Sequence, residues 1–416
     1  MVGTCTAWGV ARFVGGARSG SATGLRSAWT VDYPGQRGAT DTESGRLFAS
    51  WLVDGLIIRV QPDGVIAYKL ADGSKAWATP VPEGASMCAA TPTAAQGMAA
   101  IAFGPDTKCD KVAAVSLKDG SMTWTATVPA EEVQSSRGMR KAPLLAATGS
   151  SVLVQAVEKD LIAFGLADGR QRWRASADKY CRLRGLNADD KTVVMGQSCR
   201  EHTVQALDAA TGATRWRTAT GDSYVSAVVS VSPTVVLMSG WKSISDSPLL
   251  VFGETGEKKL DIPSTIDGIE VDNRELDNAT LGVQGRRPFL VRGDTLYVRT
   301  ALGREPKPKS KDEILAIDLS TGKRRWGSSG HAAGTITLIR VDDKGLLAME
   351  AGAYGTNPRL VHIQPDTGKA SVVVEAPAHA MDGMMRAQIH EHDGTVVMLP
   401  FQRWGNHAIV ALRPQG

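Results

Sequence analysis

Short apolar runs recur along the chain, and tight polar turns separate them. In the first complete stretch, residues 47–53 and 56–61 flank Asp54-Gly55, and residues 65–70 follow the pair Asp63-Gly64. Apolar runs of this length, bounded by Asp-Gly pairs, are typical of β-strands joined by hairpins. The pattern therefore predicts antiparallel meanders of four short strands.

A longer motif marks the last turn of each meander. It is clearest in Ala206–Trp216 (ALDAATGATRW) and Ala316–Trp326 (AIDLSTGKRRW), where a Trp follows four residues after the Gly. Gly supplies the positive φ of a tight turn, and the residues before it can hydrogen-bond to the turn backbone. We expect the Trp ring to pack across the boundary between neighbouring units. The residues expected to dock in this way are Trp29, Trp77, Trp124, Trp173, Trp216 and Trp326.

The motif recurs about every 45 residues, which is the spacing of propeller blades. Leu260 and Val372 stand in the Trp position of the fifth and seventh copies. The last copy ends before its Trp-bearing strand, whereas residues 26–33 form such a strand without a beginning. Joining the two completes an eighth unit and leaves no open sheet edge. We predict an all-β fold, an eight-bladed β-propeller of four-stranded antiparallel blades whose last blade is closed by the N-terminal strand.

The pattern A-x-D-x-x-T-G-x-x-x-W in these stretches resembles the tryptophan-docking repeat of PQQ-like eight-bladed β-propellers. That superfamily includes quinoprotein alcohol dehydrogenases and BamB-type scaffold lipoproteins. The resemblance covers nearly the whole chain from about residue 26 onward and implies the propeller fold. It does not by itself separate enzymes from binding proteins, because the repeat is structural.

Four cysteines occupy nearly equivalent positions in two repeats. Cys88 and Cys181 stand at the start of an innermost strand, and Cys109 and Cys199 lie between the second and third strands. These two points lie at the same end of a meander, so we predict the disulfides Cys88–Cys109 and Cys181–Cys199. Each closes a loop of about 20 residues, worth roughly 3 kcal/mol in the chain-entropy model. Four unrelated buried thiols, or a zinc site without any CxxC pair, fit the repeat less well. Paired disulfides indicate an extracytoplasmic protein.

Charge gives little support for nucleic-acid binding. The 416 residues include 47 Lys and Arg against 43 Asp and Glu, for a net charge of +4. The chain contains no run of basic residues interleaved with aromatic ones, and the cluster at residues 304–311 contains two prolines, which suits a solvated loop. We expect a monomer that binds a protein or a cell-envelope component and no nucleic acid.

The N-terminal segment is not typical of a signal peptide. Residues 1–24 lack a continuous apolar segment and end in a Gly, Ser and Ala-rich stretch. We assign residues 1–24 to a disordered tail or linker remnant and residues 25–416 to the propeller. Val2-Gly3-Thr4-Cys5 resembles a lipoprotein cleavage site without the preceding apolar segment. An anchor upstream of Met1 is the alternative to a free tail.

Candidate chemistry is sparse. The dehydrogenases of the superfamily carry a disulfide between adjacent cysteines and a Ca²⁺ held by acidic and amide side chains, and this chain has no Cys-Cys pair. We therefore expect no cofactor, neither PQQ nor calcium, and no catalytic residues. His390-Glu391-His392 could suit a metal and Asp272, Glu275 and Asp277 a Ca²⁺ ion. A solvated strand face and a charged loop are the favoured interpretations of these two groups.

The longest connections between second and third strands are the candidate binding surface, because rigid scaffolds commonly carry function on loops. Trp241, Tyr354 and Trp404 are their aromatic residues and the candidate anchors, with strand-end covering as the alternative role. We predict a non-catalytic extracytoplasmic propeller that acts as a binding, scaffold or sensor module through these loops. The alternatives are a PQQ-dependent quinoprotein oxidoreductase and the extracellular sensor domain of a membrane receptor kinase.

Overall fold

The computed structural model describes ten stretches of the chain. They are residues 24–33, 45–132, 141–240, 248–271, 289–300, 313–329, 335–352, 357–378, 387–403 and 405–415. Within these stretches the secondary structure is β-strand, and no helix is long and apolar enough to cross a membrane.

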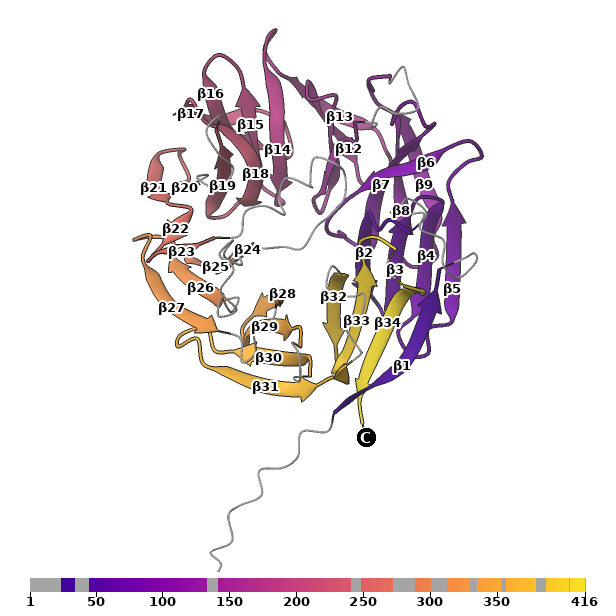
Figure 1. Cartoon of the computed structure of the whole chain (residues 1–416). Helices are drawn as coiled ribbons and strands as arrows, with labels where there is room; N and C mark the ends of the chain where they lie inside the picture. Colours follow the sequence, from indigo (N-terminus) through magenta and orange to yellow (C-terminus); the bar gives the residue numbers. More distant parts are fainter. Residues whose placement is uncertain are drawn as a thin grey trace, which may run out of the picture.

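Eight four-stranded antiparallel sheets form a ring of blades, which confirms the predicted architecture (Figure 1). The first blade consists of β2 (Ala49–Val53), β3 (Leu56–Gln61), β4 (Gly64–Lys69) and β5 (Lys75–Pro80), and the second of β6 (Ser86–Ala90), β7 (Met98–Gly104), β8 (Lys111–Ser116) and β9 (Met122–Thr127). The third blade consists of β10 (Leu144–Ala147), β11 (Ser151–Ala156), β12 (Asp160–Gly165) and β13 (Gln171–Ser176). The fourth consists of β14 (Arg182–Ala188), β15 (Thr192–Ser198), β16 (His202–Asp208) and β17 (Thr214–Gly221).

The remaining blades follow the same order from the first, inner strand to the fourth, outer strand. The fifth blade consists of β18 (Tyr224–Ser230), β19 (Thr234–Ser239), β20 (Leu249–Phe252) and β21 (Lys258–Ile262), and the sixth of β24 (Phe289–Arg292), β25 (Thr295–Arg299), β26 (Glu313–Asp318) and β27 (Arg324–Ser329). The seventh consists of β28 (Ile336–Asp342), β29 (Gly345–Glu350), β30 (Arg359–Ile363) and β31 (Ala370–Glu375). The eighth consists of β32 (Ala387–His392), β33 (Thr395–Pro400), β34 (His407–Pro414) and β1 (Leu25–Asp32). A small hairpin, β22 (Thr265–Ile266) with β23 (Ile269–Glu270), follows the fifth blade.

The eighth blade contains both ends of the ring, as the sequence predicts. β1 pairs antiparallel with β34, with Trp29 opposite Ala411. Beyond that ladder, the Gln415 N–H donates to the carbonyl of Gly24 at 2.9 Å. The two strands lie side by side in Figure 1 although they are at opposite ends of the described chain. The eighth blade is therefore complete where it packs against the first blade, and the edge of β34 is covered by β1.

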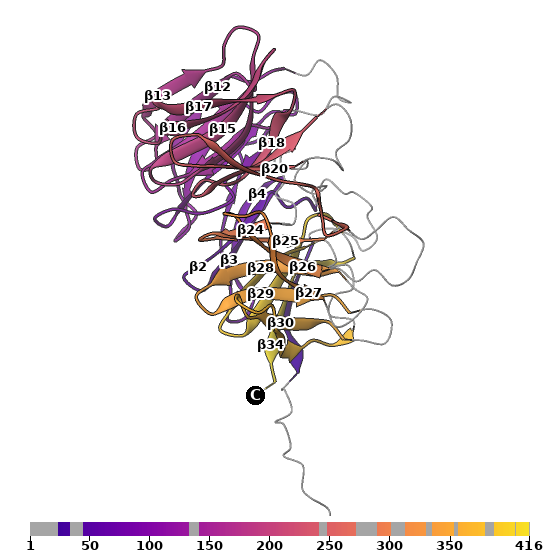
Figure 2. The ribbon, with the colours of Figure 1, turned by 90° about the vertical axis from the view of Figure 1, so that its left-hand side faces the viewer.

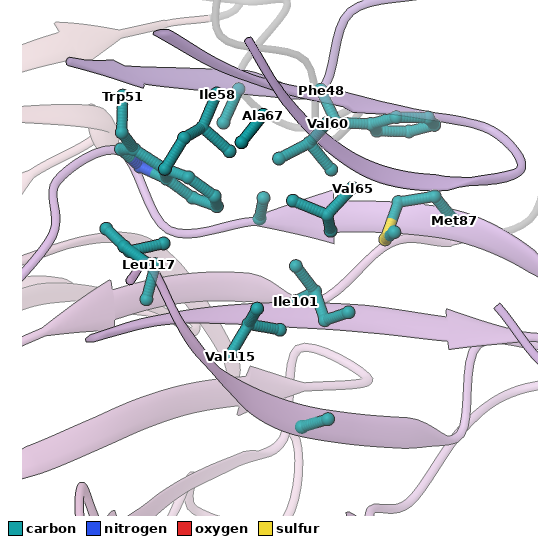
Figure 3. Close-up of a cluster of buried hydrophobic side chains, with 14 of the residues drawn as sticks. Phe48, Trp51, Ile58, Val60, Val65, Ala67, Met87, Ile101, Val115 and Leu117 are labelled. Carbon is teal, nitrogen blue, oxygen red and sulfur yellow. The ribbon is translucent and has the colours of Figure 1, made fainter. Parts of the chain in front are cut away.

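The hydrophobic core is divided among the blade interfaces. Eight clusters of buried side chains are present, and each lies between two consecutive blades. Figure 3 shows the cluster between the first two blades, where Trp51 and Ile58 face Leu117 and Val115. Because both faces of the middle strands are covered, these strands are mostly apolar, and in β12 every residue from Asp160 to Gly165 is buried.

The outer-strand tryptophans dock on the turn of the next blade. A Cβ atom placed on Gly212 would come within 2.6 Å of the Trp173 ring, and the same close approach recurs at Gly73, Gly120, Gly169, Gly256 and Gly368. The Trp173 indole N–H donates to the carbonyl of Ala209 at 3.0 Å. Equivalent bonds are made by Trp29, Trp124 and Trp326, whereas the indole nitrogen of Trp77 is buried without a partner.

The Asp of the motif organises the same turn. In the fourth blade the Asp208 carboxylate accepts the backbone N–H groups of Ala210 and Thr211 and also pairs with Arg215 at 2.6 Å. The hydrogen bonds from Arg215 and then Thr211 lower the pKa of Asp208 to about 2. The carboxylate is therefore ionised at neutral pH and holds the Gly in place for the ring above it.

Replacing Gly212 by Ala tests this docking. Gly55 has the same φ of +73° but nothing within 4 Å of an added Cβ, so Gly55→Ala is the matched control. The left-handed backbone should cost both variants about 1–2 kcal/mol. Gly212→Ala should lose a further 1–3 kcal/mol or so by overpacking against Trp173. Urea unfolding followed by Trp fluorescence measures both, and equal losses would contradict the docking role.

Candidate functional site

The two sides of the ring carry different connections. We call the "turn face" the side with the connections from first to second and from third to fourth strands. We call the "loop face" the side with the connections from second to third strands and from one blade to the next. The antiparallel order of every blade places all connections of one kind on one side (Figure 2).

Both predicted disulfides are confirmed and lie on the loop face. Cys88 in β6 bonds to Cys109 with a Cα–Cα distance of 6.2 Å, and Cys181 bonds to Cys199 with 4.4 Å. Each ties the start of an inner strand to the connection between the second and third strands of its blade. The loop face is therefore covalently fixed in the second and fourth blades.

The other predicted site residues fall elsewhere. Trp241, Tyr354 and Trp404, and also Asp272, Glu275 and Asp277, lie outside the described residues, and their roles stay predictions. Cys5 and the basic residues 304–311 lie outside them as well. The candidate site around Tyr180 was not predicted from the sequence.

The strand His390-Glu391-His392 engages three separate partners. His390 lies 2.7 Å from the hydroxyl of Ser50, Glu391 pairs with Arg340, and His392 lies 3.4 Å from Asp393. In the described stretches, no group of three or more His, Cys, Asp or Glu side chains could hold a metal ion. The three side chains therefore serve contacts along the first, seventh and eighth blades.

An exposed aromatic residue stands on the loop face between the third and fourth blades. Tyr180 is 84% exposed, and Cys181 next to it is held by the disulfide to Cys199. The ammonium group of Lys179 lies 5.3 Å from the centre of the Tyr180 ring. We call this region the Tyr180 site, and its members are Glu158, Lys159, Lys179, Tyr180, Arg182, Arg184, His202 and Tyr224.

A rare backbone conformation places the acidic residue of the site. The hairpin between β11 and β12 has positive φ at two consecutive non-glycine residues, Val157 (45°) and Glu158 (56°). The left-handed region costs an L-residue about 1–2 kcal/mol and is exceptional for a β-branched residue such as Val. The Leu183 N–H donates to the Glu158 carbonyl at 2.6 Å, so the next blade holds the hairpin in this conformation.

Among the members of the Tyr180 site, cationic side chains outnumber the one carboxylate, that of Glu158. Nη1 of Arg182 donates to one oxygen of Glu158 at 3.2 Å, and Nη1 of Arg184 donates to the other at 3.1 Å. The ammonium group of Lys159 donates to the carbonyls of Lys179 and Cys181. Glu158 is therefore held by two guanidinium groups, and Lys159 and Lys179 are the other cations of the site. The Asp178 carboxylate next to Lys179 lies 3.7 Å from Arg217.

Several buried polar atoms beside this site have no hydrogen-bond partner. Seven such side-chain atoms are found in the described stretches, and four of them belong to the third and fourth blades: Gln155 Oε1, Arg184 Nε, His202 Nδ1 and Thr203 Oγ1. The Tyr224 ring connects two of these residues, because Arg184 lies over it at 5.8 Å and His202 packs against its edge at 6.0 Å. Buried polar groups are normally hydrogen-bonded, so four unpaired atoms in two neighbouring blades mark this region as unusual.

The Tyr180 site combines an exposed ring, several donors and a fixed backbone, which suits recognition of another molecule. Its residues come from the hairpin of the third blade, the connection to the fourth blade, β14 and β16 of the fourth blade, and the first residue of β18 in the fifth blade. A concavity of about 430 Å³ lies elsewhere, lined by residues 78–82 and 119–122, and contains one ionisable side chain, Asp119. That carboxylate is held by Ser121, so the concavity offers less for binding.

Comparison with known proteins identifies relatives of the whole ring. The family model of outer membrane protein assembly factor BamB matches residues 22–180 and 200–411. No curated protein matches the chain. Among solved structures, BamB from Moraxella catarrhalis is 12% identical with a TM-score of 0.52, over 93% of this chain and 97% of that one.

Quinohemoprotein alcohol dehydrogenase from Comamonas testosteroni is also similar in fold. It is 13% identical with a TM-score of 0.55, over 95% of this chain and 78% of the enzyme. At this identity the likeness concerns the fold alone. In the described stretches the four cysteines form two disulfides, across 21 and 18 residues.

Proposed function

Because this chain belongs to the family of outer membrane protein assembly factor BamB, we propose that it is a binding and scaffold propeller of the cell envelope. It engages a protein partner through its loop face. The observation that carries the proposal is Tyr180, a large ring that is 84% exposed on a support fixed by the Cys181–Cys199 disulfide. Aromatic anchors on rigid supports bind with little loss of side-chain entropy, and they dominate the energetics of many interfaces.

The disulfides support an extracytoplasmic location for this binding. Such bonds form and persist in oxidising compartments such as the periplasm and the extracellular space. A propeller also presents the connections of all its blades on one side, which gives a broad surface for a protein partner.

Site-specific photo-cross-linking tests the proposal. A photoreactive amino acid at position 180 should give a cross-linked adduct with an envelope protein in cells. The matched control carries the same amino acid at position 118, because Lys118 is exposed on the turn face of the second blade. Equal labelling at both positions, or none at position 180, would contradict the proposal. Tight binding of PQQ with Ca²⁺ and dye-linked alcohol oxidation would replace it by the oxidoreductase alternative.

A further inference from the structure

We infer that the Tyr180 site binds an acidic segment of a protein partner, and that Glu158 occupies the place of a partner carboxylate until the partner arrives. The inference rests on the proposed function, in that the loop face must bind a protein. It adds the chemistry of the partner and a resident competitor within this chain. The internal contact thus shows which group the site accepts.

The existing carboxylate contact has the geometry that such a site needs. The two oxygens of Glu158 are divided between Arg182 and Arg184 at 3.2 and 3.1 Å. Planar guanidinium groups match carboxylates by paired hydrogen bonds, so a site built from two of them suits this group. The side chain of Arg182 is 58% exposed, and it can therefore meet a carboxylate that comes from outside.

Arg184 keeps a donor that Glu158 does not use. Its Nε carries an N–H without an acceptor, and His202 Nδ1, beside the same Tyr224 ring, is also unpaired. Both atoms are buried, so a partner carboxylate reaches them only when the side chains around Arg184 move on binding. Gln155 Oε1 and Thr203 Oγ1 are also buried and unpaired.

The backbone of the competitor is held separately from its side chain. Glu158 is held by a hairpin with φ of 45° and 56° at Val157 and Glu158. The Leu183 N–H holds the Glu158 carbonyl at 2.6 Å, a backbone contact that does not involve the carboxylate. A partner carboxylate can therefore displace the Glu158 side chain while the hairpin stays in place.

The surrounding groups favour the same partner. Tyr180 offers an exposed ring to an apolar or aromatic residue of the partner, and Lys179 next to it adds a cation. Lys159 is occupied by the carbonyls of Lys179 and Cys181, so it stiffens the connection to the fourth blade. An acidic protein segment fits this surface better than a nucleic acid, because the site already holds a carboxylate through both of its oxygens.

Fluorescence polarisation with purified full-length protein tests the inference. The probe is a short fluorescent peptide of glutamates around one central tyrosine, and its twin has glutamine in place of every glutamate. The glutamate peptide should bind at least about tenfold more tightly than the glutamine twin, a difference expected from a few charge-assisted hydrogen bonds. Raising the salt concentration should weaken the binding of the glutamate peptide alone.

The decisive variant is Glu158→Gln. It removes the competing charge and should tighten binding of the glutamate peptide about tenfold, whereas Arg182→Gln and Arg184→Gln should each weaken it by about tenfold or more. Asp168→Asn is the matched control, because Asp168 pairs with Arg172 at 2.9 Å in the same blade but on the turn face. It should leave peptide binding unchanged, and thermal unfolding of each variant checks the fold.

Several results would overturn the inference. They are weaker or unchanged binding by Glu158→Gln, equal binding of the two peptides, and tighter binding of a single-stranded DNA oligonucleotide with the same response to Glu158→Gln. If Glu158→Gln does not fold, the Arg182→Gln result decides. Cross-linking from position 180 without any preference for glutamate would refute this inference and leave the proposed function standing. If position 180 gives no cross-link to an envelope protein, the proposed function is refuted, regardless of the result of the peptide-binding experiment.

Discussion

Replacing Arg59 by Met should lower the free energy of unfolding by about 3–5 kcal/mol, the usual loss when one member of a buried charged network is removed. Arg59 in β3 is completely buried. Its guanidinium group donates to the carbonyl of Gly45 at 2.7 Å, to the carbonyl of Ala408 at 3.1 Å and to Oε1 of Gln61 at 3.3 Å. Since Ala408 lies in the eighth blade and Arg59 in the first, one side chain links the two ends of the ring.

The size of the effect follows from the acceptors that the substitution leaves behind. Each buried oxygen without a donor costs about 1–3 kcal/mol, and Met fills the volume of the alkyl stem without supplying any N–H. Burial lowers the pKa of Arg59 from its ordinary value, while the nearby Tyr33 and Tyr68 side chains oppose the shift. The Tyr33 ring lies 5.4 Å from the guanidinium carbon and contributes a cation–π contact.

Urea unfolding measures this loss. The control is Arg170→Met, because the Arg170 side chain is 83% exposed in the turn of the third blade. That variant should change stability by less than about 0.5 kcal/mol, as surface substitutions usually do. Arg59→Lys keeps the charge but lacks the several N–H donors of a guanidinium group, so its loss of unfolding free energy should lie between those of Arg59→Met and Arg170→Met. An Arg59→Met protein as stable as the control would show that the closing contact does not hold the ring.

Removing residues 1–32 should prevent the ring from closing and abolish cooperative unfolding. The truncation deletes β1, which leaves β34 as an open edge with its backbone groups unpaired. It also removes Leu25 and Trp29 from the two clusters that join the eighth blade to its neighbours. The exposed edge and apolar surface should make the truncated chain aggregate or bind hydrophobic dyes.

A peptide of residues 24–33 added to the truncated chain should restore the native fold in part. The peptide can pair with β34 and place the Trp29 indole on the Leu70 carbonyl, a bond of 3.0 Å in the intact protein. A peptide with Trp29→Ala is the control and should bind at least about tenfold more weakly, because it loses a large buried ring. Cooperative unfolding of the truncated chain without any peptide would disprove the closure.

One irregularity of the repeat has its reason in the same closure. Wherever a blade is followed by a complete third-to-fourth turn, the outer strand places Trp, or Leu260 in the fifth blade, on the turn glycine. The blade after β31 is the eighth, whose third strand is β34 and whose fourth is β1, so it has no such turn. Val372 therefore stands at the Trp position of the seventh blade with no glycine to cover, and it is 43% exposed.

The sequence by itself determined the fold, the closure and the disulfides, because their signals are local and repeated. A Gly at positive φ with an Asp or Thr before it appears in each complete third-to-fourth turn, and a Trp follows in all but the two copies that carry Leu260 and Val372, so a weak signal is confirmed by its recurrence. The cysteines could be paired because Cys88 and Cys181 occupy equivalent places in their repeats. Both inferences need only the meander of one blade and the number of copies.

Only the tertiary structure decided where charge and aromatic groups meet. In the sequence, Arg59 is one basic residue in a short strand and Glu158 one acidic residue in a turn. The ring buries the first between its two ends and brings the second against Arg182 and Arg184 of the next blade. Such side-chain contacts depend on how neighbouring sheets are placed relative to each other. The repeat does not predict them, because the motif is the same in every blade while these side chains differ. The Trp motif therefore specifies how the ring is built, while features outside it, Tyr180 and the Val157-Glu158 hairpin, form the surface that we propose to bind a partner.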